Sequence, residues 1–370
     1  MSSLPPPAVS TSAPECSGAL AGGRVSRVVS AVVVAADGAG AVALSGLTSL
    51  AAKRSLVLHI VGDGPPLVLR VSGKEEAMDA GLLAAVPGVA KVMLTVPSFP
   101  LATRTPGQDV TQIAVGSVRF GGNPVQLIAG PCAVRSAEQL DEVASVLARL
   151  GIRVMRAGAF KPRTSPYAFQ GTGLEGLRCL HVAAHRHGLA VLTEVMEPEA
   201  VAPVAALADM LQVGARNMSN YPLLRAVGRT RKPVLLKRSL SATYDELLGA
   251  AEYILSEGNP NVVLCERGIR TFVGDVRETL DISAVPVLKR KTHLPVIVDP
   301  SHAAGTRDLV APLALAALAA GADGVIIEAD GDPEMSPSDG AHSLGLAQLE
   351  ALLPRCRSIA HALGRGFLAP

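Results

Sequence analysis

The sequence predicts a (β/α)8 barrel preceded by a small ferredoxin-like βαββαβ domain. From residue 125 onward, eight short apolar runs alternate with helical patterns over about 240 residues, which fits the repeat number and length of such a barrel. A charged or metal-binding side chain follows each apolar run. Before the barrel, residues 28–98 alternate strand and helix patterns in the order βαββαβ, which is typical of the ferredoxin-like fold.

The N-terminal domain and its connector are expected to span residues 27–107. Strands are predicted at 28–35, 56–61, 67–71 and 89–96, and helices at 41–53 and 74–85. Residues 1–26 are rich in Ser, Pro and Ala, so we expect a disordered tail. The connector 97–107 is rich in Pro and Thr and is expected to let the domain move relative to the barrel.

The barrel is expected to occupy residues 108–370, beginning with a hairpin at 111–120 that turns at Gly116-Ser117. The clearest helical patterns lie at 137–150, 243–256 and 307–320. A doubly wound open sheet is the alternative, but no GxGxxG follows the first strand and eight units are many for that fold. The predicted barrel strands are 125–129, 152–156, 189–193, 210–213, 233–236, 261–265, 295–298 and 324–327.

Composition limits the classes of function. The net charge is +2 and no Lys/Arg run is interleaved with aromatic residues, which argues against nucleic-acid binding. The five cysteines form no CxxC pair, which indicates a reducing compartment. Residues 1–23 lack the features of a signal peptide, and the apolar segment 309–320 is too short to span a bilayer. We therefore expect a soluble cytoplasmic protein without membrane partners.

Chemically capable side chains collect at the C-terminal ends of the predicted strands, where barrels of this kind carry their active sites. Each residue alone has an ordinary explanation, such as a core cysteine or a surface acid. The strands themselves are almost purely apolar, so the set as a whole indicates an active site. Its members are Cys132, Arg156, Lys161, Arg163, Glu194, Arg216, Lys237, Arg238, Glu266, Arg267, Arg270, Asp299, His302, Glu328 and Asp339.

These residues divide into metal ligands and cations. One thiolate, one imidazole and two carboxylates would suit a single divalent ion (Mn, Fe, Co or Zn), and they come from Cys132, His302, Glu328 and Asp339. The cations would be costly to desolvate around one mouth unless anions neutralise them. Arg238 and Arg270 also fit a basic rim that faces water. The other cations match two phosphate groups, which suggests a metal that polarises a carbonyl beside two phosphorylated substrates.

Unusual strings occur in order at these strand ends: Ile128-Ala-Gly-Pro-Cys132, Lys161-Pro-Arg-Thr-Ser-Pro-Tyr167, Phe169-Gln-Gly171, Val213-Gly-Ala-Arg-Asn217, Leu236-Lys-Arg238, Cys265-Glu-Arg-Gly-Ile-Arg270, Leu280-Asp-Ile-Ser-Ala-Val-Pro286 and Val298-Asp-Pro-Ser-His302. The chain thereby resembles 3-deoxy-D-arabino-heptulosonate 7-phosphate (DAHP) synthase of type I with a ferredoxin-like N-terminal regulatory domain. The resemblance is strong over 110–355 and weak over 28–98. It implies condensation of phosphoenolpyruvate with erythrose 4-phosphate, the first step of the shikimate pathway to the aromatic amino acids.

The resemblance also implies roles for the matched residues. The enol carbon would attack an aldehyde polarised by the metal, water would add to the oxocarbenium carbon, and phosphate would leave. Lys161, Glu194 and His302 are alternatives for the group that handles protons. The metal ligands would be Cys132, His302, Glu328 and Asp339. Phosphoenolpyruvate would contact Arg156, Lys161, Arg216, Lys237 and Arg267. Erythrose 4-phosphate would contact Arg163, Thr164 and Ser165, with Asp299 near its hydroxyls.

Regulation is a further implication of the resemblance. The expected form is a homotetramer in which paired N-terminal domains mediate feedback inhibition by tyrosine or phenylalanine. His59 matches an effector-binding histidine, but Val61 stands where a hydroxyl residue is expected, which speaks against tyrosine. The alternative is that residues 28–98 only stabilise the oligomer.

Two departures from the family pattern affect the barrel mouth. Asp330 stands where the family commonly has a histidine, and it is expected either beside the metal or in a solvated loop. Ser239-Leu240 follows Lys237-Arg238 where Gly-Met is common. Neither departure removes a proposed ligand.

Two alternative functions are weighed. The related 3-deoxy-D-manno-octulosonate 8-phosphate synthase uses the same enol donor, but it usually carries Lys-Ala-Asn-Arg-Ser after strand 2. The string Lys161-Pro-Arg-Thr-Ser165 therefore favours the four-carbon acceptor. A non-catalytic paralogue that senses metabolites through residues 28–98 is the other alternative. The intact set of four candidate metal ligands argues against it.

Overall fold

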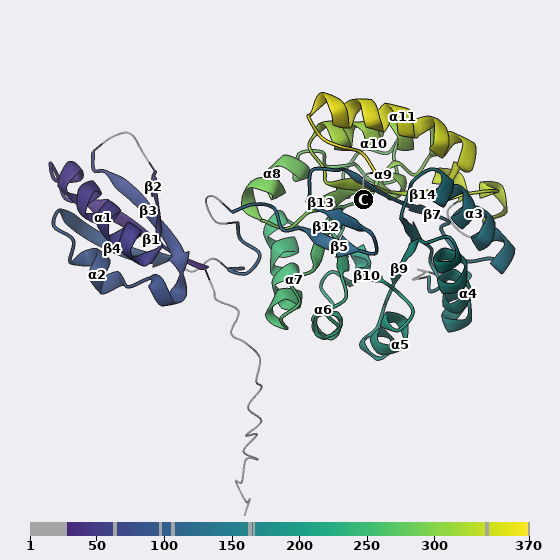
Figure 1. Cartoon of the computed structure of the whole chain (residues 1–370), viewed down its shortest axis with the longest axis horizontal. Coiled ribbons are helices and arrows are strands. Elements are labelled where there is room, and N and C mark those ends of the chain that lie inside the picture. The colour runs from purple at the N-terminus through teal and green to yellow at the C-terminus, as the bar shows by residue number, and fades with distance from the viewer. Residues whose placement is uncertain are drawn as a thin grey trace, which may run out of the picture.

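The computed structural model describes residues 28–61, 65–95, 98–104, 108–161, 165, 167–336 and 340–368 (Figure 1). The expected disordered tail 1–26 lies outside the described residues, as do the predicted site residues Arg163, Thr164 and Asp339. In the part of the chain that is described, no helix is both long enough and apolar enough to cross a bilayer.

Eight parallel strands close into a barrel surrounded by helices, which confirms the predicted fold (Figure 1). The strands follow one another in chain order, and pairing of the last with both the first and the seventh closes the ring. They are β7 (Gln126–Gly130), β8 (Val154–Arg156), β9 (Ala190–Glu194), β10 (Met210–Val213), β11 (Val234–Lys237), β12 (Val262–Glu266), β13 (Val296–Val298) and β14 (Gly324–Asp330). The helices are α3 (Ala137–Arg149), α4 (Gly173–Arg186), α5 (Val201–Ala205), α6 (Tyr221–Arg229), α7 (Tyr244–Ser256), α8 (Ala284–Lys291), α9 (Pro300–Ala304), α10 (Arg307–Ala319) and α11 (Leu346–Ala362).

A hairpin closes the N-terminal end of the barrel, as its sequence predicts. It consists of β5 (Ile113–Val115) and β6 (Val118–Phe120), and its apolar side chains pack with the inward-facing residues of the barrel strands. The turn residue Gly116 lies against Ala190, the first residue of β9. Because this end is filled, the open mouth is the C-terminal end, where the polar residues gather.

Side-chain caps fix the start of two barrel helices that the sequence predicts. The hydroxyl of Ser136 accepts a hydrogen bond from the amide of Gln139 at 3.2 Å and begins α3. Thr243 and Glu246 form a reciprocal capping box at the start of α7. Capping satisfies amides that have no partner within the helix, so both helices begin within one residue of the predicted position.

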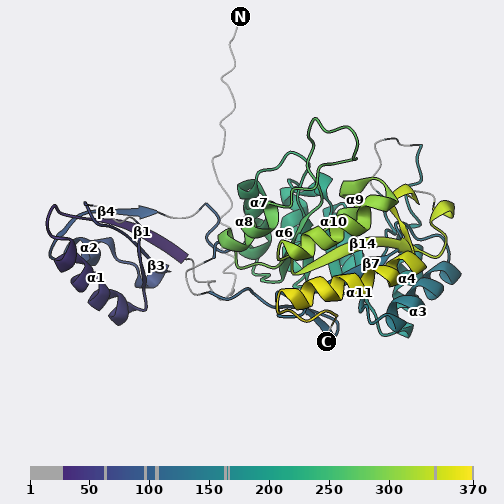
Figure 2. The same ribbon diagram turned by 90° about the horizontal axis from the view of Figure 1, so that it is seen from above.

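The N-terminal domain is a four-stranded antiparallel sheet in the order β2-β3-β1-β4, which agrees with the ferredoxin-like prediction. Figures 1 and 2 place it to one side of the barrel. Alternate sheet residues such as Val33 and Val71 form a separate small core with the two helices. The elements are β1 (Val28–Ala35), α1 (Gly40–Arg54), β2 (Val57–Ile60), β3 (Val68–Lys74), η1 (Glu75–Ala77), α2 (Ala80–Ala84) and β4 (Val89–Thr95).

The single helix predicted over 74–85 is wrong. Strand β3 continues to Lys74, a 3₁₀ turn follows, and α2 begins only after Asp79. The side chain of Asp79 accepts hydrogen bonds from the amides of Gly81 and Leu82 at 2.9 and 3.1 Å. An aspartate in this position favours a helix start over a helix interior, which explains the break.

The part of the connector that the structure describes, residues 98–104, is hydrogen-bonded to the barrel. The carboxylate of Glu252 on α7 accepts hydrogen bonds from the amides of Leu101 and Ala102, each at 2.9 Å. The hydroxyl of Thr292 donates to the carbonyl of Ala102 at 2.5 Å. Barrel side chains thus satisfy backbone groups of this segment.

Candidate active site

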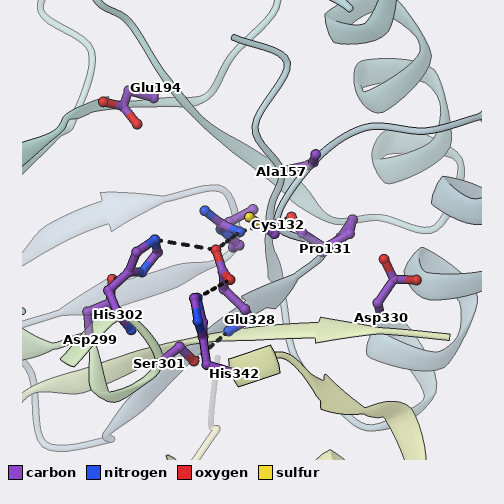
Figure 3. A network of polar contacts seen from close by, with 12 residues as sticks. Pro131, Cys132, Ala157, Glu194, Asp299, Ser301, His302, Glu328, Asp330 and His342 are labelled. Carbon is purple, nitrogen blue, oxygen red and sulfur yellow. Dashed lines mark hydrogen bonds and ion pairs between the residues drawn. The ribbon is translucent and has the colours of Figure 1, made fainter. Parts of the chain in front are cut away.

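Side chains from the last two barrel strands and the loops after them converge at the mouth (Figure 3). They are His302 on α9, Glu328 on β14, and His342 at the end of the 3₁₀ turn η5 (Gly340–His342). One nitrogen or oxygen atom from each lies within 4.8 Å of the others. Nε2 of His342 is 3.0 Å from Oε2 of Glu328, and Nε2 of His302 is 3.5 Å from Oε1. We call these three residues the His-Glu-His group.

The His-Glu-His group fits a divalent metal ion. Oε2 of Glu328 and Nε2 of His342 are buried and make no hydrogen bond, although they are 3.0 Å apart. Unsatisfied buried polar atoms cost free energy, and an ion between them would satisfy both. Two imidazoles and a carboxylate are also donors that divalent transition ions accept.

The protonation states of the group suit a metal site as well. Burial lowers the pKa of His302 to about 4, although the charge of Asp299 opposes the shift, so the ring is neutral near pH 7. Burial opposes ionisation of Glu328, yet the charges of His302 and Arg156 hold its pKa well below the usual range. A neutral imidazole and an ionised carboxylate are the forms that bind a metal.

Cys132 lies beside this group, at the end of β7 (Figure 3). Nζ of Lys161 is 3.0 Å from both the Sγ and the carbonyl oxygen of Cys132. Gly130, the last residue of β7, lets this strand end lie close to the backbone of Arg156 at the end of β8. Its φ of +146° favours glycine, and a Cβ there would lie 2.1 Å from the carbonyl oxygen of Arg156.

His342 is absent from the residues that the sequence pattern predicts. A lone histidine in a long loop has no diagnostic spacing to a partner. Its place is decided by β15 (Leu344–Gly345), which returns to pair with the end of β14 at Ala329 and Asp330. The only sequence signal is its position three residues after Asp339, which lies outside the described residues.

Asp330 points away from the His-Glu-His group in Figure 3. One carboxylate oxygen accepts a hydrogen bond from Nε2 of Gln139 at 2.6 Å, and the other pairs with Arg135 at 3.0 Å. The residue is 1% exposed. The solvated-loop alternative is therefore wrong, because Asp330 is buried and ties the end of β14 to the start of α3.

Two buried ion pairs and one imidazole–carboxylate contact connect the strand ends. Nη1 of Arg156 donates to Oε1 of Glu328 at 2.8 Å. Oδ2 of Asp299 lies 2.5 Å from Nζ of Lys237 and 2.7 Å from Nδ1 of His302. Burial would raise the pKa of Asp299, but His302 and Lys237 hold it well below its usual range. The carboxylate of Asp299 thus orients a candidate metal ligand and a candidate substrate-binding cation at once.

A cavity of about 290 Å³ lies over the ends of β10, β11 and β12. Arg267 is the important residue, because its Nη1 is buried without a hydrogen bond and its nearest acid, Glu278, is 3.8 Å away. Guanidinium groups outnumber carboxylates in this lining, and that charge suits an anion such as phosphate. The charged lining residues are Arg216, Arg267, Arg270, Arg277 and Glu278.

Arg238 does not face water, contrary to one interpretation of the sequence. It is 6% exposed and pairs with Glu266 at 2.9 Å and Asp281 at 2.8 Å. Its guanidinium also lies 4.6 Å from the centre of the Tyr244 ring. These partners hold the loop after β11 and neutralise the positive charge of Arg238. Arg270, in contrast, is exposed and lines the arginine-rich cavity.

Glu194 ends β9 on another side of the mouth, where Gln212 donates to its carboxylate at 3.1 Å. Burial raises the pKa of Glu194 even though Lys237, Lys161 and Arg156 oppose the shift. Gly214 leaves room for this carboxylate, since a Cβ there would lie 2.0 Å from Oε1 of Glu194.

Two predicted residues lie apart from these groups. Ser165 is exposed, and its hydroxyl accepts a hydrogen bond from the amide of Tyr167 at 3.3 Å. His59 lies on β2 of the N-terminal domain, paired across the sheet with Arg70. The described structure therefore does not bring either residue to the His-Glu-His group.

Comparison with known proteins identifies the family of the chain. Residues 105–363 match the model of the DAHP synthetase I family. The phospho-2-dehydro-3-deoxyheptonate aldolase of Thermotoga maritima is 43% identical over 318 residues, covering 86% of this chain and 94% of that protein. A 2-dehydro-3-deoxyphosphooctonate aldolase of Bradyrhizobium diazoefficiens is 36% identical over 266 residues, covering 66% of this chain and 92% of that protein.

Solved structures show the same similarity. The crystal structure of the Thermotoga maritima DAHP synthase has a TM-score of 0.72 and 40% identity, covering 92% of this chain and 99% of that chain. A truncated form of 3-deoxy-D-arabino-heptulosonate 7-phosphate synthase from Thermotoga maritima has a TM-score of 0.69 and 44% identity, covering 73% of this chain and 99% of its own.

Proposed function

Because the chain belongs to the DAHP synthetase I family, it is a 3-deoxy-7-phosphoheptulonate synthase, and we propose that the residues at its barrel mouth perform the condensation. The reaction joins phosphoenolpyruvate to erythrose 4-phosphate and releases inorganic phosphate, the first step of the shikimate pathway. The observation that carries the proposal is Nη1 of Arg267, which is buried without a hydrogen bond in an arginine-lined cavity at the barrel mouth that also carries a candidate metal group.

Phosphoenolpyruvate is proposed to bind with its phosphate in the anion cavity, where Arg216 and Arg267 are available. Lys161 follows β8 and Lys237 ends β11, and both are proposed to supply charge for the carboxylate and the bridging oxygen. Arg156 already donates through Nη1 to Glu328 and the carbonyl of Pro131, so only its other nitrogens are assigned to the substrate. Water-poor surroundings strengthen each of these charge-assisted hydrogen bonds.

One divalent ion (Mn, Fe, Co or Zn) is proposed to bind Cys132, His302, Glu328 and Asp339. When bound, it would supply Lewis-acid polarisation of the aldehyde of erythrose 4-phosphate. The support from the described residues is the orphaned pair of atoms in the His-Glu-His group. Asp299 and Arg156 keep His302 and Glu328 in place through the contacts described above.

Lys161 and Glu194 are proposed to handle the protons. A carbon–carbon bond forms between C3 of phosphoenolpyruvate and C1 of the aldehyde, and the new alkoxide takes up a proton. Water then adds at C2 and loses a proton; the C2–O bond to phosphate breaks as the new C2 hydroxyl gives its proton to the departing phosphate, which leaves the C2 ketone. Glu194 is suited to hold a proton because burial raises its pKa, and Lys161 is cationic at the mouth. His302 is left to its metal-binding role.

An acceptor assay with metal control tests this function. Chelator-treated protein is expected to lose turnover of phosphoenolpyruvate with erythrose 4-phosphate, and a divalent transition ion is expected to restore it. Arabinose 5-phosphate should be the poorer acceptor by kcat/KM. Cys132→Ser should bind metal more weakly, with Cys179→Ser, a half-buried cysteine on α4, as the control. Full turnover in demonstrably metal-free protein, or preference for arabinose 5-phosphate, would overturn the proposal.

Arg163 is proposed to bind the phosphate of erythrose 4-phosphate, together with Thr164 and Ser165. Removing its guanidinium by Arg163→Ala should raise the KM for erythrose 4-phosphate by about 10-fold or more, because a charge-assisted contact of about 1.5–3 kcal/mol is lost. The KM for phosphoenolpyruvate should stay nearly constant. Arg153→Ala, a change outside the mouth, serves as the control. Equal increases in both KM values would contradict the assignment.

Residues 28–95 are proposed to bind an aromatic amino acid that inhibits the enzyme, with His59 at the effector site and paired domains in a homotetramer. The domain has its own core and carries none of the residues gathered at the barrel mouth, which favours a regulatory or assembly role. Exposed Val61 removes the hydroxyl expected beside His59, which favours phenylalanine over tyrosine as the effector.

Truncation should separate regulation from assembly. The shortened chain should begin at residue 98, since 98–104 are hydrogen-bonded to the barrel. If the domain regulates, the truncated enzyme keeps turnover but ignores every aromatic amino acid, and His59→Gln in the full chain weakens inhibition. A full-length enzyme that is itself indifferent to tyrosine, phenylalanine and tryptophan would leave only the assembly role, which sedimentation of both chains would reveal.

A further inference from the structure

We propose that His342 is a ligand of the catalytic metal, so that two imidazoles hold the ion on either side of Glu328. This inference rests on the proposed metal-dependent function and adds a donor to the proposed set. Its starting point is the pair of atoms left without hydrogen bonds in a buried position, Nε2 of His342 and Oε2 of Glu328.

The backbone holds His342 at this place firmly. Strand β15 follows His342 by one residue and pairs with the end of β14, which carries Glu328. Arg307 on α10 donates to the carbonyl of Ser343 at 2.7 Å and to that of Gly340 at 3.1 Å. The turn that carries the imidazole is therefore fixed on both sides of the ring, as a preorganised ligand requires.

The geometry between His342 and Glu328 favours a shared cation over a direct hydrogen bond. The two atoms lie 3.0 Å apart without a satisfied hydrogen bond, and one ion can contact both at that separation. Oε1 of Glu328 already has Arg156 as a donor, so Oε2 is the oxygen left for another partner. Both rings present Nε2 to the same carboxylate, since Nε2 of His302 is 3.5 Å from Oε1 of Glu328 and Nε2 of His342 is 3.0 Å from Oε2.

The chemistry of the donor set leads to a preference among metals. An added imidazole makes the site richer in nitrogen, and nitrogen ligands suit Zn, Co and Fe, whereas Mn prefers oxygen. Asp330 does not change this balance, since its two oxygens are taken by Arg135 and Gln139. We therefore expect this enzyme to bind Zn²⁺ or Co²⁺ more tightly than Mn²⁺ by a margin that depends on His342.

Counting coordinated imidazoles tests the proposal directly. Full-length protein freed of metal would be loaded with Cu²⁺ as a probe, and pulsed electron paramagnetic resonance would count imidazole nitrogens. Two imidazoles are expected in the natural protein and one in His342→Gln, whose amide can still donate a hydrogen bond to Glu328. Co²⁺ affinity, measured by chelator competition, should fall by at least about 10-fold in the variant. His361→Gln, at an exposed position on α11, is the matched control.

Each outcome decides the question. A single imidazole in the natural protein would overturn the proposal without any variant. Two imidazoles that persist in His342→Gln, with Co²⁺ affinity within threefold of the natural protein, would also overturn it. A protein that binds metal through two imidazoles but condenses neither sugar phosphate would leave the ligand inference standing and refute the proposed function.

Discussion

Glu328→Gln is expected to lower kcat of the condensation by about 1000-fold or more, because weaker metal binding would remove a Lewis-acid stabilisation of the transition state of several kcal/mol. The amide removes the negative charge that faces both histidines. It also leaves Arg156, 5% exposed, without its carboxylate partner. A buried cation that loses its partner is strongly destabilising, so the unfolding temperature should fall as well.

Metal content, metal affinity and kcat of Glu328→Gln would be measured together. The control is Glu350→Gln, because Glu350 is half exposed and pairs with Arg149 at 3.0 Å on the surface. Exposed pairs contribute little, so the control should behave like the natural protein. If Glu328→Gln bound metal normally and turned over within tenfold of the natural rate, Glu328 would not be a ligand.

Asp299→Asn is expected to damage two functions at once. The variant would leave Lys237, 3% exposed, without a counter-charge, and would take away the carboxylate that orients His302. We expect metal affinity to fall by about 10- to 100-fold, as for other outer partners of metal-binding histidines. The KM for phosphoenolpyruvate should rise, and stability should fall by about 3–5 kcal/mol.

A surface pair of the same type provides the control for this prediction. Asp245 and Lys291 are 2.5 Å apart but well exposed, so Asp245→Asn should change stability by less than about 1 kcal/mol. The sequence resemblance assigned Asp299 to the hydroxyls of erythrose 4-phosphate instead. If Asp299→Asn raised only the KM for that substrate and left metal affinity unchanged, that assignment would be favoured over a positioning role.

The sequence by itself determined the barrel and where its chemistry lies. Apolar strands followed by polar tips are a local pattern, and the parallel barrel brings all eight strand ends to one mouth. Cys132, His302 and Glu328 each lie at or just after the C-terminal end of a strand, and the position of the apolar run in the sequence is enough to predict this. Capping residues such as Ser136 and Thr243 likewise act on their own helices, so their sequence signal was sufficient.

Only the tertiary structure decided the partners of the polar residues. His342 reaches Glu328 because β15 pairs with β14, and Asp330 turns to Gln139, almost 200 residues away in sequence. The Pro/Thr composition of the connector likewise does not reveal Glu252 on α7, whose carboxylate accepts hydrogen bonds from the connector backbone. Hydrogen bonds and ion pairs depend on distances of a few ångströms between residues far apart in the chain. The local sequence pattern does not encode those distances. Which residues are buried and where each strand ends, in contrast, follow directly from hydrophobic periodicity.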